Sequence, residues 1–175
     1  SYVEAAFRVI VPMFCMITGF YYDATARKGK TTAQIKKIAK LLVFAIGLHI
    51  LWEYLTAAAA GLSTAAFVKY CLNPVSWLKF FLFNATEHGG HLWYLGAVLY
   101  SLILLHIADR FHIRERLYWL IPVLILANLV LGNYSVLLLG RRMPVLLTRN
   151  FLFFTLPFLL MGDWIRKTAL QIKNP

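Results

Sequence analysis

Long runs of apolar residues, separated by short polar stretches, make up most of this chain. A helix that crosses a lipid bilayer needs roughly 20 predominantly apolar residues. Five segments reach or approach that length: Ala5–Tyr22, Leu41–Ala60, Leu92–Ile107, Leu117–Leu139 and Phe151–Ile165. The third and fifth are short, so we expect them to extend into their flanks, to tilt, or to be partly buried in protein. The pattern predicts an all-α fold, a polytopic bundle with five membrane helices.

A shorter apolar segment, Val75–Phe83, lies between the second and third long ones. It is too short to cross a bilayer, and its aromatic side chains surround Lys79, which is typical of a helix at the membrane interface. Pro74 suits the first turn of such a helix and Asn73 its N-cap. We find no soluble domain and no repeat, so residues 1–175 are predicted to form a single integral membrane domain.

Composition supports a membrane protein. Of the 175 residues, 61% are hydrophobic and 14% are charged, whereas a soluble domain has about 45–50% apolar and about 25% charged residues. These values exclude an ordinary soluble globule, a disordered tail and a disulfide scaffold. Cys15 and Cys71 are isolated, and they indicate neither a disulfide framework nor a metal cluster.

The net charge of +11 is distributed unevenly between the two predicted sides of the membrane. No nucleic-acid-binding motif accompanies this charge, so we do not expect nucleic acid as a partner. Twelve lysines and arginines fall on one side: Arg27, Lys28, Lys30, Lys36, Lys37, Lys40, Arg110, Arg114, Arg116, Arg166, Lys167 and Lys173. Five fall on the other: Lys69, Lys79, Arg141, Arg142 and Arg149. The positive-inside rule makes the first side cytoplasmic and places Ser1 outside. We therefore expect a piece of a longer protein, with at least one more helix before Ser1 and a truncated C-terminus.

Two charged residues fall inside apolar segments. A charge at depth costs about 2.5–3.5 kcal/mol on insertion scales and usually marks a functional or paired position. Arg8 precedes Pro12 in the first segment; it is either functional or close enough to the surface for its guanidinium to reach the headgroups. Glu53 lies one turn after His49, and it either relays a proton or holds a cation, or pairs with an arginine such as Arg8.

Further candidates lie on the predicted outer side. In the run His88–Leu95, two glycines separate His88 from His91, and Trp93 follows. Two histidines are too few for a catalytic zinc site, but His91 could bind a hydroxyl group or carry a proton. Trp93 also suits an aromatic belt. A basic patch, Arg141, Arg142, Arg149 and Asn150, suits either an anion or lipid headgroups. The following are expected to be structural or interfacial: His106, His112, Asn128 and Asp163.

Three stretches together resemble the acyltransferase-3 family of bacterial membrane acyltransferases. Phe7–Tyr21 (FRVIVPMFCMITGFY) resembles the family's stretch with Arg, Val-Pro and a later Gly. His91–Leu95 (HLWYL) resembles a helix start with His and Trp, and Arg149–Phe158 (RNFLFFTLPF) with Gly162 resembles a third family helix. The order also agrees with the family. Within it, the chain is similar to the membrane domain of the serine/alanine racemases of vancomycin-resistance clusters.

The resemblance implies a bundle with about twice as many helices in a bacterial cytoplasmic membrane. It implies acyl transfer from acyl-CoA, as co-substrate, to a hydroxyl of a cell-surface glycan or related acceptor, without a metal or a tightly bound cofactor. The family's histidine, in a helix before this chain, would be the base, and Arg8 and His91 would assist catalysis. From its place inside an apolar segment, and not from the resemblance, we also expect Glu53 to assist catalysis. The implied substrate-binding residues are Trp93, Arg149 and Asn150. We expect the chain alone to be inactive.

Two other functions remain open. The chain could deliver serine or another small solute to an attached racemase, which a downstream domain with a pyridoxal phosphate lysine would favour. It could also be a non-catalytic anchor or sensor, against which the buried Arg8 and Glu53 argue.

Overall fold

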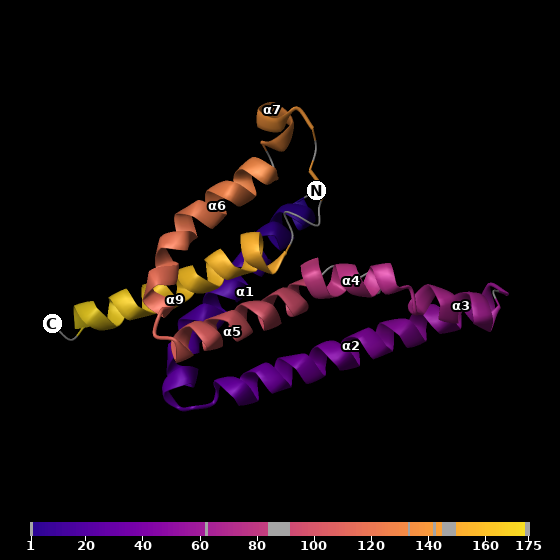
Figure 1. The fold of residues 1–175 in the computed structure, drawn as a ribbon, viewed down its shortest axis with the longest axis horizontal. Coiled ribbons are helices and arrows are strands. Elements are labelled where there is room, and N and C mark those ends of the chain that lie inside the picture. Colours follow the sequence, from indigo (N-terminus) through magenta and orange to yellow (C-terminus); the bar gives the residue numbers. More distant parts are fainter. Residues whose placement is uncertain are drawn as a thin grey trace.

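The computed structural model of this protein describes residues 2–61, 63–83, 92–132, 134–141, 143–144 and 150–173; for residues 2–8, 83, 139 and 173 it describes the backbone alone. Within these ranges the chain is helical and has no strand (Figure 1), which confirms the predicted all-α class. The elements are α1 (Tyr2–Arg27), α2 (Thr31–Ala59), α3 (Thr64–Cys71), α4 (Pro74–Phe83), α5 (Trp93–Arg110), the 3-10 helix η1 (Arg114–Trp119), α6 (Leu120–Leu131), α7 (Ser135–Leu139), the π-helix η2 (Phe151–Thr155) and α9 (Leu156–Lys173).

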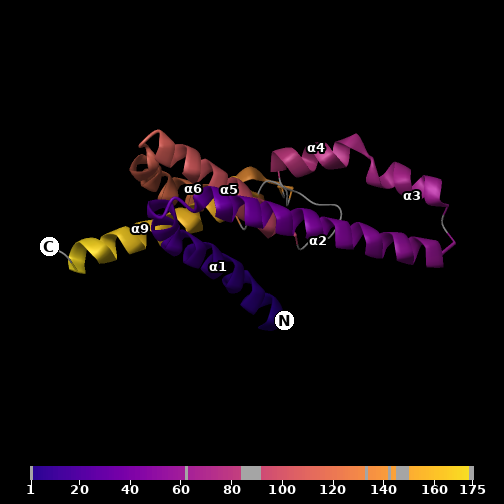
Figure 2. The same cartoon turned by 90° about the horizontal axis from the view of Figure 1, so that it is seen from below.

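Helices α1, α5 and α9 run in the same direction, and α2 and α6 run back (Figures 1 and 2). The end of α1, the start of α2, the end of α5 and η1 therefore gather at one end of the molecule, which we call the basic end. The starts of α1, α5 and η2 lie toward the opposite end, which we call the far end. Helices α3 and α4 follow the outer part of α2.

Helices α1 and α9 cross at two glycines. A Cβ atom added at Gly19 would lie 1.9 Å from the carbonyl oxygen of Leu159, and one added at Gly162 would lie 1.9 Å from that of Met16. Any larger residue at either position would collide with the backbone of the other helix. The two glycines thus bring the two backbones into direct contact and fix where the helices cross.

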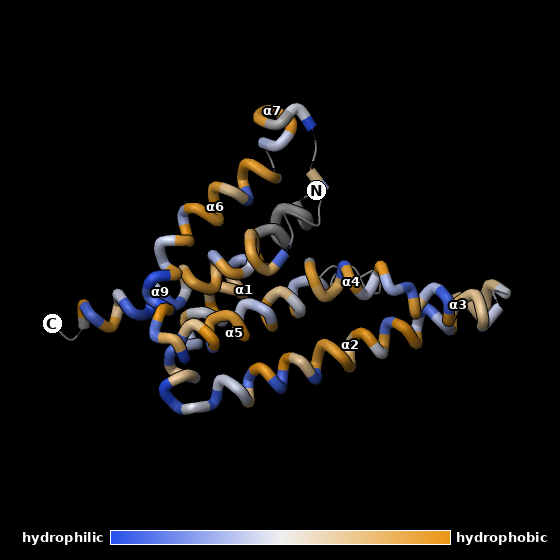
Figure 3. The backbone as a smooth tube through the Cα atoms, in the orientation of Figure 1, coloured by the Kyte–Doolittle hydropathy of each residue, from blue (hydrophilic) through white to orange (hydrophobic). Residues whose placement is uncertain are grey.

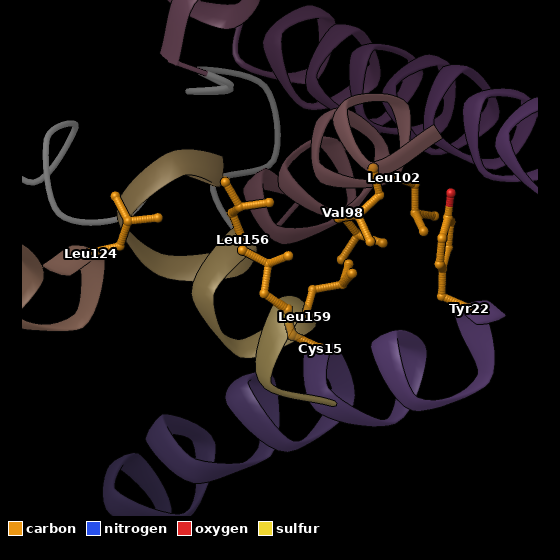
Figure 4. Close-up of a cluster of buried hydrophobic side chains, with 9 residues drawn as sticks. Cys15, Tyr22, Val98, Leu102, Leu124, Leu156 and Leu159 are labelled. Atoms are coloured by element: carbon orange, nitrogen blue, oxygen red, sulfur yellow. The ribbon is translucent and has the colours of Figure 1, made fainter. Parts of the chain in front are cut away.

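The main hydrophobic core fills the space between α1, α5, α6 and α9 (Figure 4). Its buried members are Cys15, Tyr22, Val98, Leu102, Leu105, Leu124, Leu156, Leu159 and Leu160. A smaller cluster, Leu42 with Leu95 and Leu99, packs α2 against α5. Helix α2 is therefore attached near its start, and the rest of it extends away from the core.

Large apolar side chains cover the outside of the molecule. Trp52 on α2 is 66% exposed, and Val43 and Phe44 of the same helix are exposed as well. Figure 3 shows apolar residues along the length of α2 and α6. Among the described residues, two helical segments are long and apolar enough to cross a membrane, Val9–Arg27 and Thr31–Ala59, and only 22% and 6% of their apolar windows are buried. Most of their side chains therefore face outward, although Cys15 and Tyr22 of the first segment and Leu42 of the second contribute to the core.

Most predicted segments correspond to helices, with corrected limits. Helix α2 begins at Thr31 rather than at Leu41, because its first turns are basic and a hydropathy pattern does not include them. Helix α4 begins at Pro74 as predicted, and the Oδ1 atom of Asn73 accepts a hydrogen bond from the N–H of Val75 at 3.0 Å. The N-cap prediction is therefore confirmed.

The prediction of one helix over Leu117–Leu139 was wrong. The segment starts in η1, continues as α6 and ends at Leu131, where Gly132 is the C-cap, and α7 follows as a separate short helix. Glycine commonly ends helices because it lacks a Cβ atom. Helix α3 was not predicted; the Oγ atom of Ser63 caps it by accepting a hydrogen bond from the N–H of Ala66 at 3.3 Å.

Candidate functional site

Two of the predicted substrate-binding residues lie at the far end and belong to elements that touch. Trp93 is the first residue of α5, and its ring meets that of Phe154 on η2 edge to face, with 5.4 Å between centroids. Asn150 is the N-cap of η2, 5% exposed, and its Oδ1 atom accepts a hydrogen bond from the N–H of Phe153 at 2.9 Å. Because Phe153 and Phe154 are neighbours, the cap and the aromatic pair fix this corner of the molecule together.

The structure describes only some of the other predicted site residues. Arg8 lies on α1, one turn before Pro12, and its side chain is outside the described part. His91 and Arg149 lie outside the described residues. Glu53 lies in the last third of α2, partly exposed, one turn after His49. By topology, the starts of α1, α5 and η2 and the later part of α2 all lie toward the far end.

The three stretches that carry the family resemblance contact one another. The first lies on α1, the second at the start of α5, and the third on η2 and α9. Gly19 of the first meets Leu159, which lies between Phe158 and Gly162 of the third, and Trp93 of the second meets Phe154 of the third. Segments up to 146 positions apart in the sequence, as Met16 and Gly162 are, are thus packed together.

A buried ionic cluster at the basic end was not predicted. All three aspartates of the chain surround one arginine, Arg114. Its Nη2 atom lies 2.9 Å from Oδ1 of Asp23, its Nη1 atom 3.0 Å from Oδ1 of Asp109, and its Nε atom 3.3 Å from Oδ2 of Asp163. We call this group the aspartate cluster. It ties α1, α5 and α9 to η1.

The aspartate cluster is shielded from solvent. The side chain of Asp163 is 1% exposed and that of Arg114 is 16% exposed. Burial alone would lower the pKa of Arg114, but the charges of Asp163 and Asp109 and the hydrogen bond to Asp23 outweigh it and raise that pKa above its ordinary value. The surrounding carboxylates therefore favour the charged form of Arg114.

Two tyrosines complete the hydrogen bonding. The hydroxyl of Tyr22 donates to Oδ2 of Asp109 at 3.0 Å, and that of Tyr118 donates to Oδ2 of Asp163 at 2.8 Å. The Arg114 guanidinium also lies over the Tyr22 ring, 5.7 Å from its centroid. Paired, hydrogen-bonded charges of this kind are retained in interiors because removing one partner is costly.

The charges of the aspartate cluster balance. Besides Arg114, Arg27 contacts Oδ2 of Asp23 through its Nε atom at 2.8 Å, and Arg166 approaches the same oxygen at 4.0 Å. Three arginines therefore neutralise three aspartates. Among the described residues, no group of three or more histidine, cysteine or acidic side chains could hold a metal ion; an arginine occupies the centre of the aspartate cluster instead. This arrangement fastens α1, α5 and α9 to η1.

No protein-family model matches the chain, and no curated protein or solved structure matches it. Inference of function therefore rests on the three motif stretches, on their arrangement and on the chemistry of the described residues.

Proposed function

We propose that this chain is the membrane-embedded part of a bacterial O-acyltransferase similar to the acyltransferase-3 family. It would transfer an acyl group, typically acetyl, from acyl-CoA to a hydroxyl of a cell-surface glycan or a related acceptor. The observation that supports this most is the contact between the three motif stretches. Residues that build one site must meet in space, and the contacts of Gly19 with Leu159 and of Trp93 with Phe154 bring the three stretches together.

The exposed apolar surface supports a location in a membrane. Removing apolar surface from water stabilises a protein by about 25 cal/mol per square ångström, and exposed apolar surface lacks this stabilisation. Soluble monomers accordingly rarely expose large contiguous apolar patches. The helices with exposed apolar side chains, above all α2, would instead face lipid. We propose five membrane-crossing segments, of which the fourth is interrupted after Leu131, with α4 at the interface and the basic end on the cytoplasmic side.

The proposed reaction moves the acyl group from the sulfur atom of a thioester to the oxygen atom of a hydroxyl group. A histidine base in the full-length protein takes the proton of the acceptor hydroxyl, and the oxygen attacks the thioester carbonyl. The carbon–sulfur bond breaks, the thiolate of CoA leaves, and it takes up a proton. Arg8 would stabilise the negative charge that develops, in a site of low dielectric. His91 would hold the acceptor, and Glu53 would hold an arginine or relay a proton.

Trp93 and the N-cap at Asn150 would position the acceptor beside these groups. The edge-to-face contact of Trp93 with Phe154 holds the indole in one orientation, and the cap fixes the start of η2. Arg149, next to Asn150, would bind a negatively charged part of the acceptor.

The test uses the full-length gene product in bacterial membranes with acetyl-labelled acetyl-CoA. Label that enters glycan and is released by mild alkali reports an O-acetyl ester. We expect Trp93→Ala and Arg8→Gln to lower this label at least about tenfold. Trp52→Ala is the matched control, because Trp52 lies exposed on α2, away from the motif stretches.

Absence of ester label from the wild-type protein would contradict acyl transfer. Uptake of labelled serine in the same membranes would then support the solute-delivery function. Equal loss in Trp93→Ala and Trp52→Ala would reject the proposed site, since both would act only through general stability.

A further inference from the structure

A cleft of about 370 Å³ lies beside the aspartate cluster at the basic end. It is bounded by the turn between α1 and α2, the first residues of α2, and the last turns of α5. The residues that line it are Ala26, Gly29, Thr31, Thr32, His106, Asp109 and Arg110. The chain thus brings two hydroxyl groups, an imidazole and a guanidinium to one concave surface.

The turn that forms one wall is well defined. Gly29 has φ 64, a left-handed conformation that favours glycine. The N–H groups of Gly29 and Lys30 donate to the carbonyl oxygens of Ala26 and Thr25 at 2.9 and 3.0 Å. Thr31, which begins α2, is buried at 3% exposure. The wall is therefore preformed rather than a loose loop.

The region around the cleft carries a net positive charge. The acidic side chains of the described basic end are already engaged: the three aspartates with arginines, and Glu115 with Lys167. Arg110 is exposed and has no ion-pair partner among the described residues. Lys28, Lys30, Lys36, Lys37 and Lys40 add further exposed cations on the same turn and the start of α2.

One acidic residue, Asp109, also lines the cleft. Its carboxylate is held by Arg114 at 3.0 Å and by the hydroxyl of Tyr22 at 3.0 Å. Its charge is therefore compensated from the side of the aspartate cluster, and it repels an anion in the cleft only weakly.

We propose that this cleft binds a phosphate group, with Arg110 as the principal contact and His106, Thr31 and Thr32 as further hydrogen-bonding partners. A phosphate offers several strong acceptor oxygens and more than one negative charge, which fits a site with a guanidinium, hydroxyl donors and surrounding lysines. The phosphate belongs either to a lipid headgroup or to a soluble ligand such as the acyl-CoA of the proposed reaction. Binding in the cleft requires neither acyl transfer nor a particular acceptor.

The test uses the full-length protein in nanodiscs of phosphatidylcholine, titrated with inorganic pyrophosphate. We expect Arg110→Gln to raise the Kd about tenfold. Arg116→Gln is the charge-matched control: Arg116 is exposed on η1 and does not line the cleft, and we expect less than about a threefold rise. Thr32→Val, which removes one hydroxyl and leaves the charge unchanged, gives a second and independent measure, with an expected rise of about threefold.

A second set of nanodiscs contains phosphatidylglycerol, and retained lipid is measured by native mass spectrometry. Pyrophosphate binding unaffected by this lipid supports a soluble ligand. Retention of phosphatidylglycerol by the wild type and Arg116→Gln, but not by Arg110→Gln, supports a headgroup. Equal weakening by both arginine variants, or binding of neither probe, would overturn the proposal. Because no acyl transfer is measured, failure here is distinguishable from failure of the acyltransferase proposal.

Discussion

Replacing Gly19 by alanine should strongly weaken the contact between α1 and α9. The added Cβ atom would lie 1.9 Å from the carbonyl oxygen of Leu159, whereas real Cβ contacts essentially never fall below 3.0 Å. The helices must therefore separate by about 1 Å at their crossing, and a gap of about 0.5–1 Å already removes a quarter to a half of the dispersion energy of each contact. Overpacking typically costs about 1–3 kcal/mol. We expect the upper end, because the obstacle is backbone and cannot rotate away.

Gly47→Ala on α2 is the matched control, because nothing lies within 4 Å of a Cβ atom added there. Alanine is favoured over glycine inside a helix by up to about 1 kcal/mol, so this variant should be unchanged or slightly more stable. Thermal unfolding in one detergent compares the two. A loss of about 3 kcal/mol corresponds to a Tm lower by about 6–12 °C for a chain of this size. If Gly19→Ala melted like Gly47→Ala, the direct backbone contact of α1 and α9 would be refuted.

Three further predictions follow from the same contacts. Arg114→Gln leaves the carboxylates of buried Asp23 and Asp163 and of half-buried Asp109 without their central cation. It should lower the free energy of unfolding by about 3–5 kcal/mol, while exposed Arg116→Gln should change it by less than about 0.5 kcal/mol. Equal effects in a denaturant titration would contradict the structural role of the aspartate cluster. Tyr118→Phe removes the hydroxyl that donates to Asp163 at 2.8 Å and should cost about 1–2 kcal/mol, so an unchanged midpoint would count against this bond. Trp52, exposed on α2, should contact acyl chains, so brominated lipid should quench the fluorescence of the wild type more than that of Trp52→Phe; equal quenching would place this face outside the bilayer.

The helices could be predicted largely from hydropathy, and their limits could not. A run of apolar residues marks the part of a helix that is removed from water. Helix α2 begins at Thr31, in a stretch rich in lysine, and a hydropathy pattern does not include that stretch. The apolar segment is interrupted after Leu131, where Gly132 is the C-cap and the sequence continues Asn133-Tyr134-Ser135. So short a break is invisible to an average over the whole segment. Helix α3 is short, and its signal is a single serine cap.

The aspartate cluster could not be found by spacing, because its members lie on separate elements. Asp23, Asp109 and Asp163 share no sequence motif. Asp163 was expected to be structural or interfacial, and in the structure it forms an ion pair with Arg114. One signal was present: the chain has only three aspartates, and each lies near the basic end of an apolar segment. Alternating helix directions place these positions on one side, where several nearby arginines provide partners.

The most direct measurement of the proposed function is consumption of acetyl-CoA by oriented membrane vesicles that contain the full-length protein. Free CoA thiol is followed after acetyl-CoA is added outside sealed inside-out and right-side-out vesicles. Because the basic end is proposed to face the cytoplasm, we predict thiol release in inside-out vesicles and its loss in Arg8→Gln. Thiol release in right-side-out vesicles alone would contradict the orientation, and no protein-dependent release in either kind of vesicle would contradict acyl transfer from acetyl-CoA.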